Sequence, residues 1–186
     1  MAIALTRRRF TVDEYERMVE VGILCADDRL ELIDGEIVEM TPIGSRHAGR
    51  VFRLTSLFTS RLGERAIVGV QGPIRLSADS QVQPDIVLLR PRPDFYTESH
   101  AGPADVLLVV EVADTSLQAD RHVKLPLYAR SGIPEVWLLD LTEHMLTVYR
   151  RPGSLAYEEE RTLRPADRLS PETFPDLVLA PADLLG

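Results

Sequence analysis

The sequence predicts an α/β fold with a mixed β-sheet flanked by helices, an N-terminal hairpin and C-terminal strands. Two observations carry this prediction. The run Val106–Val112 is almost wholly branched and apolar, which is typical of a strand covered on both faces, and helical segments alternate with strand-like segments. With 186 residues, 45% of them hydrophobic, the chain can bury a full core, and no repeat or linker divides it. We expect one domain over residues 1–186.

The first elements are expected to be a helix and a hairpin. Thr11–Val21 has helical character, with Thr11 as N-cap and Glu14 three residues later as its capping-box partner. Arg29–Met40 contains two alternating apolar runs around Asp34-Gly35. Because this pair supplies the positive φ values of a tight turn, we expect a β-hairpin.

A second helix is expected from Ser45, as its N-cap, to about Gly63, since apolar residues recur there at helical spacing. Successive residues are rotated by about 100 degrees, which places four arginines on a neighbouring face. This basic ridge has two interpretations, contact with a phosphate backbone or an ordinary solvated helix face. Its members are Arg46, Arg50, Arg53 and Arg61.

The remaining apolar segments predict the sheet. Between the second helix and a Pro-rich, charged loop at residues 90–105, we expect strands at Ala66–Gln71, Ile74–Leu76 and Asp85–Leu89. After Val106–Val112 and one more helix, further strands are expected at Glu135–Asp140, Met145–Arg151 and Ala156–Leu163. One or two additional strands and a short tail should end the chain.

The last predicted helix runs from about Leu117 to Arg130. Thr115 is its expected N-cap, with Gln118 as capping-box partner. Pro126 lies within it, and proline removes a backbone hydrogen bond. The helix should therefore bend at Pro126 or begin later than its pattern indicates.

Composition limits the class of protein. A net charge of −8 argues against non-specific coating of nucleic acid, which goes with a basic excess, but it suits a hard-metal site, whose ligands are acidic oxygens. The lone Cys25 has no partner for a disulfide or a zinc site, which fits a reducing compartment. With neither a signal-peptide pattern nor a membrane-spanning apolar run, we expect a cytoplasmic protein without membrane attachment.

Lys124 stands out because Lys and Arg together number 21 and it is the only lysine. A compact ammonium and a forked guanidinium do not interchange at a catalytic position, so chemistry can explain its retention. Chance would also account for it, since an Arg-rich sequence still leaves a stray lysine. A third reading is structural, because Lys124 could simply pair with Asp120 one helical turn away.

Two carboxylates accompany this lysine. Glu111 interrupts the apolar run VLLVVEV, where a charge must be paired, protonated, at the open end of the strand or bound to a metal. Asp85 opens the preceding buried strand, although a turn role would also account for it. If the two strands are neighbours, both carboxylates meet and Lys124 can reach over them. Phosphodiester hydrolysis needs such parts, acidic oxygens for Mg²⁺ or Mn²⁺ and a cation beside them.

Several segments resemble the Uma2-like (DUF820) family of endonucleases, which have the restriction-endonuclease-like PD-(D/E)xK core. The resemblance is strongest over residues 29–150 and rests on ELIDGEIVEM, PDIVLL, LLVVEV and KLPLYARSGIPEVWLLD. It implies that Asp85 and Glu111 are metal ligands and that Lys124 is the motif lysine. The ordinary motif places this lysine two positions after Glu111, where the chain has Ala113, so the resemblance implies that the lysine function has moved to the following helix.

The resemblance also implies two supplementary site residues, Glu31 and His47. The hairpin pattern leaves open whether Glu31 or Glu36 points inward, and Glu31 is preferred. Taken alone, His47 would more often be a core or capping residue. A second departure from the family is the segment after Glu111, Ala-Asp-Thr-Ser, where relatives tend to carry a Ser-Pro-Ser type loop.

The expected function is hydrolysis of DNA by metal-activated water, with Mg²⁺ or Mn²⁺ as cofactor and with homodimerisation as one way to cut both strands. The alternative is a catalytically inactive nuclease-fold domain used for nucleic-acid or protein binding. A hydrolase of another phosphate ester is a third class. The sequence has no G-x-x-x-x-G-K loop, which disfavours nucleoside triphosphates as substrates.

Overall fold

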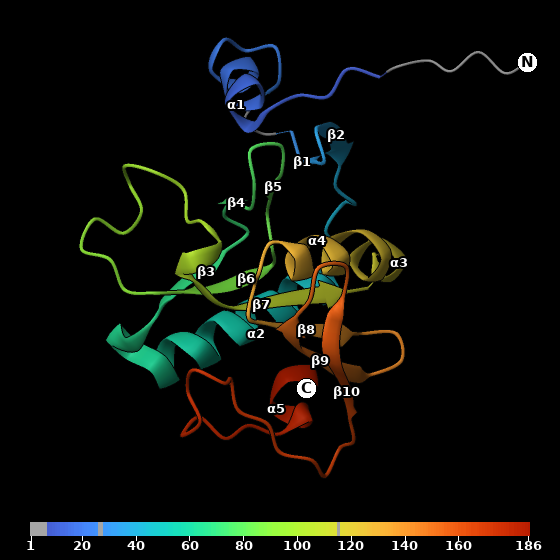
Figure 1. Cartoon of the computed structure of the whole chain (residues 1–186). Coiled ribbons are helices and arrows are strands. Elements are labelled where there is room, and N and C mark those ends of the chain that lie inside the picture. The colour runs from blue at the N-terminus through green and yellow to red at the C-terminus, as the bar shows by residue number, and fades with distance from the viewer. Residues whose placement is uncertain (1–6, 26–27, 115) are drawn as a thin grey trace, which may run out of the picture.

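A six-stranded sheet forms the centre of the computed structural model, which describes residues 7–25, 28–114 and 116–186 (Figure 1). The strand order is β10-β9-β8-β7-β6-β3. Within this sheet β7 and β8 are parallel and the other neighbours are antiparallel, so the predicted mixed sheet is confirmed. Its strands are β3 (Ile67–Val70), β6 (Ile86–Leu89), β7 (Val106–Ala113), β8 (Glu135–Asp140), β9 (Met145–Pro152) and β10 (Tyr157–Leu163).

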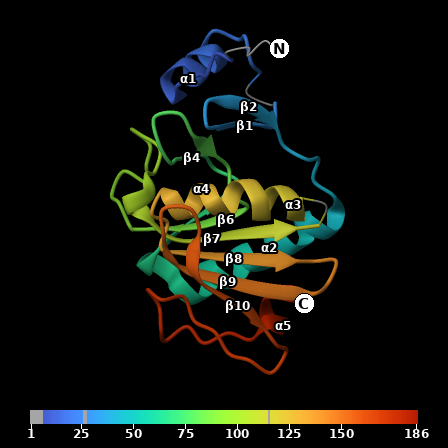
Figure 2. The ribbon, with the colours of Figure 1, turned by 45° about the vertical axis from the view of Figure 1, so that its right-hand side comes forward.

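Helices cover both faces of this sheet, as Figure 2 shows. On one face α2 (Ser45–Leu62) packs its apolar stripe, including Leu54 and Phe58, against Trp137 of β8. On the other face lies a helical segment formed by α3 (Leu117–Ala119), a π-helical turn (Asp120–Lys124) and α4 (Leu125–Arg130). Residues of β7 enter both apolar clusters, Leu108 and Val110 one and Val109 and Ala113 the other, so this strand is buried on both faces, as its sequence predicts.

A four-stranded sheet of order β2-β1-β5-β4 stands beside the first (Figure 1). The predicted hairpin forms, and its turn residues Asp34 and Gly35 have φ of 50° and 76°. The predicted capping box of Thr11 and Glu14 also forms, at the start of α1 (Val12–Glu20). The strands of this sheet are β1 (Leu30–Ile33), β2 (Glu36–Glu39), β4 (Ile74–Arg75) and β5 (Gln81–Val82).

Several predicted details are wrong. Gly44, with extended backbone, is the N-cap of α2, and Ser45 is already helical and makes no capping bond. Strand β5 has no counterpart among the expected elements, because two residues after a polar turn carry no periodic pattern. The expected terminal strands are replaced by one isolated bridge, Leu169 to Leu179, and by α5 (Pro181–Leu185), which a proline in its first turn favours.

The helix predicted at 117–130 forms with a π-helical turn just before Pro126. Leu125 N–H donates to the carbonyl of Asp120, five residues back. A proline lacks an N–H and its ring crowds the carbonyl four residues before it, so a wider turn accommodates it at the start of α4. The expected N-cap, Thr115, lies outside the described residues. Among the described helices, none is long and apolar enough to span a bilayer.

Candidate active site

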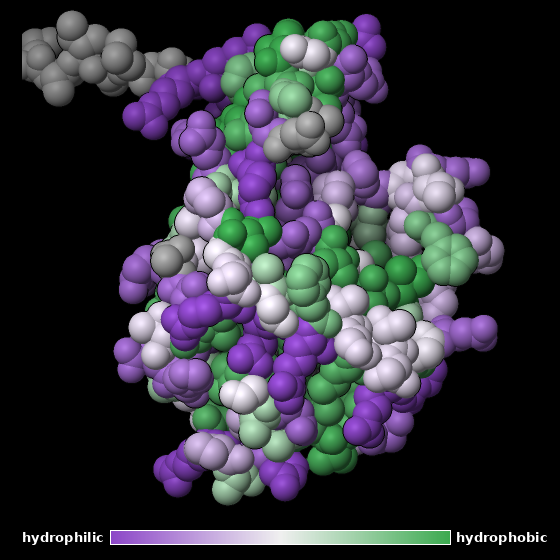
Figure 3. Space-filling view, turned by 180° about the vertical axis from the view of Figure 1, so that it is seen from behind, coloured by the Kyte–Doolittle hydropathy of each residue, from purple (hydrophilic) through white to green (hydrophobic). Residues whose placement is uncertain are grey.

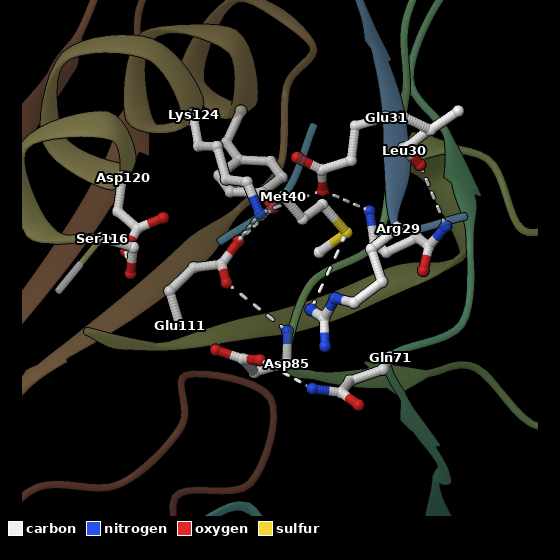
Figure 4. Close-up of polar contacts among 12 residues, drawn as sticks. Arg29, Leu30, Glu31, Met40, Gln71, Asp85, Glu111, Ser116, Asp120 and Lys124 are labelled. Atoms are coloured by element: carbon white, nitrogen blue, oxygen red, sulfur yellow. Dashed lines mark hydrogen bonds and ion pairs between the residues drawn. The ribbon is translucent and has the colours of Figure 1, made fainter. Parts of the chain in front are cut away.

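All five residues singled out from the sequence line one cleft of about 550 Å³ between the β1–β2 hairpin and the α3–α4 segment. Each comes from a different element, which explains why no local motif unites them. The cleft residues drawn in Figure 4 point toward one another across this space. The five are Glu31, His47, Asp85, Glu111 and Lys124.

Asp85 and Glu111 meet because β6 and β7 are neighbours. Asp85 directly precedes β6, and the ladder pairs Ile86 with Val110, one residue before Glu111. The backbone N–H of Asp85 donates to Glu111 Oε2 at 3.4 Å, and that of Val112 donates to Asp85 Oδ2 at 2.9 Å. Both side chains are buried. The strand neighbourhood expected from the sequence is confirmed.

Lys124 reaches these carboxylates from the π-helical turn. Its Nζ lies 3.0 Å from Glu31 Oε1 and 3.3 Å from Glu111 Oε1. Asp120 instead accepts a hydrogen bond from Ser116 Oγ at 2.7 Å. The lysine therefore pairs with carboxylates distant in sequence rather than with its helical neighbour.

The hairpin presents Glu31 and not Glu36 to the interior of the cleft. Glu31 is 4% exposed and also accepts from the backbone N–H of Gln83 at 2.7 Å. Glu36 is exposed and lies 3.7 Å from Arg7. The two residues occupy facing strands of the hairpin, and only the inner one is within reach of the lysine.

His47 lies against Asp85. Its Nε2 is 2.9 Å from Asp85 Oδ2, while Gln71 Nε2 donates to Asp85 Oδ1 at 3.3 Å. His47 Nδ1 is buried and has no hydrogen-bond partner among the described residues. The histidine is therefore neither a cap nor a satisfied core residue, and it orients one oxygen of Asp85.

Sequence reasoning missed three cleft neighbours, Tyr128, Gln71 and Arg29. Tyr128 donates its hydroxyl to Glu111 Oε1 at 2.5 Å from one helical turn beyond Lys124. That spacing could have found it, because residues four apart share a helix face. Gln71 and Arg29 carry no such signal, since a loop and a strand start bring them to the site.

Burial sets the electrostatics of the cluster. It raises the pKa of Glu111 to about 8, which Lys124 partly opposes and Asp120 reinforces. Burial lowers the pKa of Lys124, but the surrounding carboxylates outweigh it and the net pKa is raised. Burial likewise raises the pKa of Tyr128, which keeps its proton and remains a donor. The lysine is therefore an ammonium, and Glu111 is a carboxyl whose anionic form burial disfavours.

Asp85 and Glu111 fit a hard divalent cation. Their donors are carboxylate oxygens, which Mg²⁺ and Mn²⁺ prefer, and a cation beside Glu111 would stabilise the anionic form that burial disfavours. Within the described ranges, no group of three or more His, Cys, Asp or Glu side chains is arranged as a complete metal site. This matches Mg²⁺, which keeps waters and takes one or two carboxylates plus substrate phosphate oxygens.

The basic ridge of α2 is partly structural. Arg46 lies 3.3 Å from Asp114 and donates to the carbonyl of Leu141 at 2.8 Å. Arg53 donates to the carbonyl of Asp183 at 3.3 Å. At least two of the four arginines thus tie α2 to other parts of the protein, which reduces the positive surface left for a phosphate backbone.

Comparison with known proteins agrees with this fold. The model of the Uma2 family, described as "Putative restriction endonuclease", matches residues 12–182. The uncharacterized protein sll1609 of Synechocystis sp. is 25% identical over 158 residues, covering 82% of this chain and 87% of that protein. A crystal structure described as "a putative nuclease belonging to DUF820", from Anabaena variabilis, has a TM-score of 0.72 at 18% identity, covering 95% of this chain and 97% of that one, and thus shares the fold. Because the family model matches nearly the whole chain, this protein belongs to the Uma2 family of restriction-endonuclease-like proteins.

Proposed function

We propose that this protein is a Mg²⁺- or Mn²⁺-dependent nuclease that hydrolyses DNA phosphodiester bonds with an activated water. One observation carries the proposal. Asp85 and Glu111 lie side by side in an open cleft, and the only lysine of the chain contacts Glu111 at 3.3 Å. Family membership supports the same chemistry.

In the proposed mechanism Asp85 and Glu111 would hold the divalent cation. When bound, this cation supplies the Lewis acidity that activates water for attack on phosphorus. Lys124 is an ammonium in this environment, so it donates hydrogen bonds and stabilises negative charge in the transition state instead of removing a proton. Glu31 fixes the position of Lys124, and His47 fixes the orientation of Asp85.

The alternative is a nuclease-fold domain that only binds nucleic acid or protein. The burial of the carboxylates argues against this alternative. Four of them are buried around one lysine, namely Glu31, Asp85, Glu111 and Asp120. Like charges gathered out of water destabilise a fold unless a ligand or a function compensates them. A domain that needed only to bind would gain stability by replacing them with apolar residues.

Supercoiled plasmid tests the proposal directly. The purified protein is incubated with Mg²⁺, Mn²⁺ or EDTA, beside Lys124→Ala, Lys124→Arg and Asp85→Ala. We expect nicking and linearisation by the wild type only with metal, and a loss of at least about 100-fold in each variant. Unchanged circular dichroism shows that the variants are folded. Absence of cutting on DNA and on RNA by the wild type would favour the binding domain, and full activity of Lys124→Arg would remove the special role of the lysine.

Two sites brought together in a homodimer are one way to cut both strands, and we include a homodimer formed on DNA in the proposal. Figure 3 shows one face of the molecule, on which hydrophilic and apolar residues alternate in small patches. That face offers no broad apolar area of the kind that obligate dimers bury. For a dimer that forms on DNA, sedimentation should give a monomer without DNA and two copies per duplex with DNA, and a single copy per duplex would contradict the dimer.

A further inference from the structure

Arg29 lines the same cleft, and its side chain has no ionic partner among the described residues. Its main chain is fixed where the hairpin opens, because its carbonyl accepts from Met40 N–H at 2.7 Å. Its Nε is buried without a hydrogen-bond partner. Its one described side-chain contact is a weak one, from a terminal guanidinium nitrogen to Met40 Sδ at 4.0 Å. A buried donor left unpaired destabilises a fold, so the position of this side chain needs a reason.

The direction in which the Arg29 side chain points supplies such a reason. In Figure 4 the guanidinium of Arg29 extends from the hairpin toward the side of the cleft occupied by Asp85 and Glu111. All three residues line one cleft. A phosphate bound to a cation that Asp85 and Glu111 hold would therefore face the free N–H donors of Arg29.

Charge balance gives the second argument. Acidic residues outnumber basic ones along the cleft, whose basic residues are Arg9, Arg29 and Lys124. Lys124 is engaged by Glu31 and Glu111, and Arg9 donates to the backbone carbonyl of Asp34. Arg29 is thus the cleft cation whose side chain donates to no oxygen acceptor among the described residues, which leaves its donors for an incoming anion. A phosphodiester entering an acidic cleft needs such a partner.

We propose that Arg29 is a catalytic residue that binds the non-bridging oxygens of the phosphate being cut. This inference rests on the proposed nuclease function. A guanidinium presents two parallel donors to a phosphate, which an ammonium cannot do. Attack by water increases the negative charge on these oxygens, so the two hydrogen bonds strengthen in the transition state and accelerate the reaction.

Single-turnover cleavage measured against protein concentration separates binding from chemistry. Arg29→Ala should lower the maximal rate at least about 100-fold and change the half-saturating concentration less than about threefold. Arg29→Lys should fall between the wild type and Arg29→Ala. Millimolar guanidinium should restore part of the rate of Arg29→Ala. The matched control is Arg9→Ala, the other arginine of the cleft, which should stay within about twofold of the wild type.

Stability distinguishes catalysis from a structural role. Since Arg29→Ala removes an unpartnered buried donor, its unfolding midpoint should equal or exceed that of the wild type. Three results would overturn the inference: an unchanged maximal rate, an effect on half-saturation alone, which would place Arg29 on a neighbouring phosphate, or a lowered midpoint without rescue by guanidinium. If the wild type itself fails to cut, the proposed function falls and the role of Arg29 falls with it. If the wild type cuts and Arg29→Ala cuts equally well, only the role of Arg29 is lost.

Discussion

At the scale of single residues, Glu31 and Glu36 form a matched pair, because they share a hairpin and differ in which side they face. Glu31 contacts Lys124 at 3.0 Å, and Glu36 is exposed. We expect Glu31→Gln to lower plasmid cutting about 10- to 100-fold, since the lysine loses a partner that holds it, and Glu36→Gln to leave it unchanged. If both substitutions change plasmid cutting equally, the two hairpin glutamates contribute only their negative charge, and Glu31 has no specific role in holding Lys124.

The protonation of Glu111 predicts a pH dependence. Its pKa is raised to about 8, mainly by burial, so the metal-free carboxyl holds a proton at neutral pH. Binding of a cation must release that proton, and the apparent affinity for Mn²⁺ should therefore rise as pH increases from 6 to about 8. Lys124, Asp120, Asp85 and Tyr128 surround the group and act on its pKa, Lys124 and the hydrogen bond of Tyr128 by lowering it and the two aspartates by raising it. Calorimetry of Mn²⁺ binding in two buffers of different ionisation enthalpy measures the released protons. Addition of Mn²⁺ to Glu111→Gln should release none.

The same scale shows which site residues a sequence can reveal. Glu111 and Lys124 were identifiable because a charge within an apolar strand and a single lysine among arginines both require a reason. Tyr128 and Arg29 were not, since a tyrosine in an apolar helix and an arginine before a strand are ordinary. Their importance depends on contacts across the cleft, which only the folded chain creates.

At the scale of elements, the π-helical turn places Lys124 in the site. Leu125 N–H reaches back five residues, and Pro126 favours this by lacking the N–H that an α-helix would use. Pro126→Ala should let the turn relax toward an α-helix and rotate Lys124 away from Glu111. We expect cutting to fall about tenfold without loss of thermal stability. Wild-type activity of this variant would show that packing of α4 alone holds the lysine.

Elements with strong periodic patterns could be predicted, and those set by tertiary pairing could not. The β1–β2 hairpin, α1 and β7 follow from turn residues, a capping box and an apolar run. Strand β5 has two residues, and it exists because β1 and β4 flank it. The C-terminal segment packs mainly through isolated leucines and Phe174 on the core, so its sequence has no period to indicate a helix or a strand.

At the scale of the whole molecule, the protein contains two buried clusters of opposite character. Glu135 is fully buried, and it accepts hydrogen bonds from Trp137, from Arg150 and from the backbone of Glu172. Around Glu111, in contrast, several carboxylates share one lysine. Burial raises the pKa of both glutamates, but Glu135 has an arginine close to it, whereas Glu111 shares its lysine with Glu31 and also has Asp85 and Asp120 nearby. We infer that the cluster around Glu135 stabilises the fold, whereas the cluster around Glu111 serves the proposed nuclease reaction.

Substitution by glutamine should therefore have opposite effects on stability at the two glutamates. A carboxyl whose folded pKa is raised contributes stability below its unfolded pKa and loses it as pH rises through the folded value, about 8 for Glu111. At pH 8 in EDTA, Glu111→Gln should then raise the free energy of unfolding by about 1–2 kcal/mol, while Glu135→Gln should lower it by about 3 kcal/mol, because Arg150 loses its buried partner.

Saturating Mg²⁺ should stabilise the wild type, by about 2.7 kcal/mol at 100 times the dissociation constant, and should not stabilise Glu111→Gln. Urea unfolding of the three proteins measures all of these changes, and destabilisation by Glu111→Gln in EDTA would show that Glu111 is there for the fold.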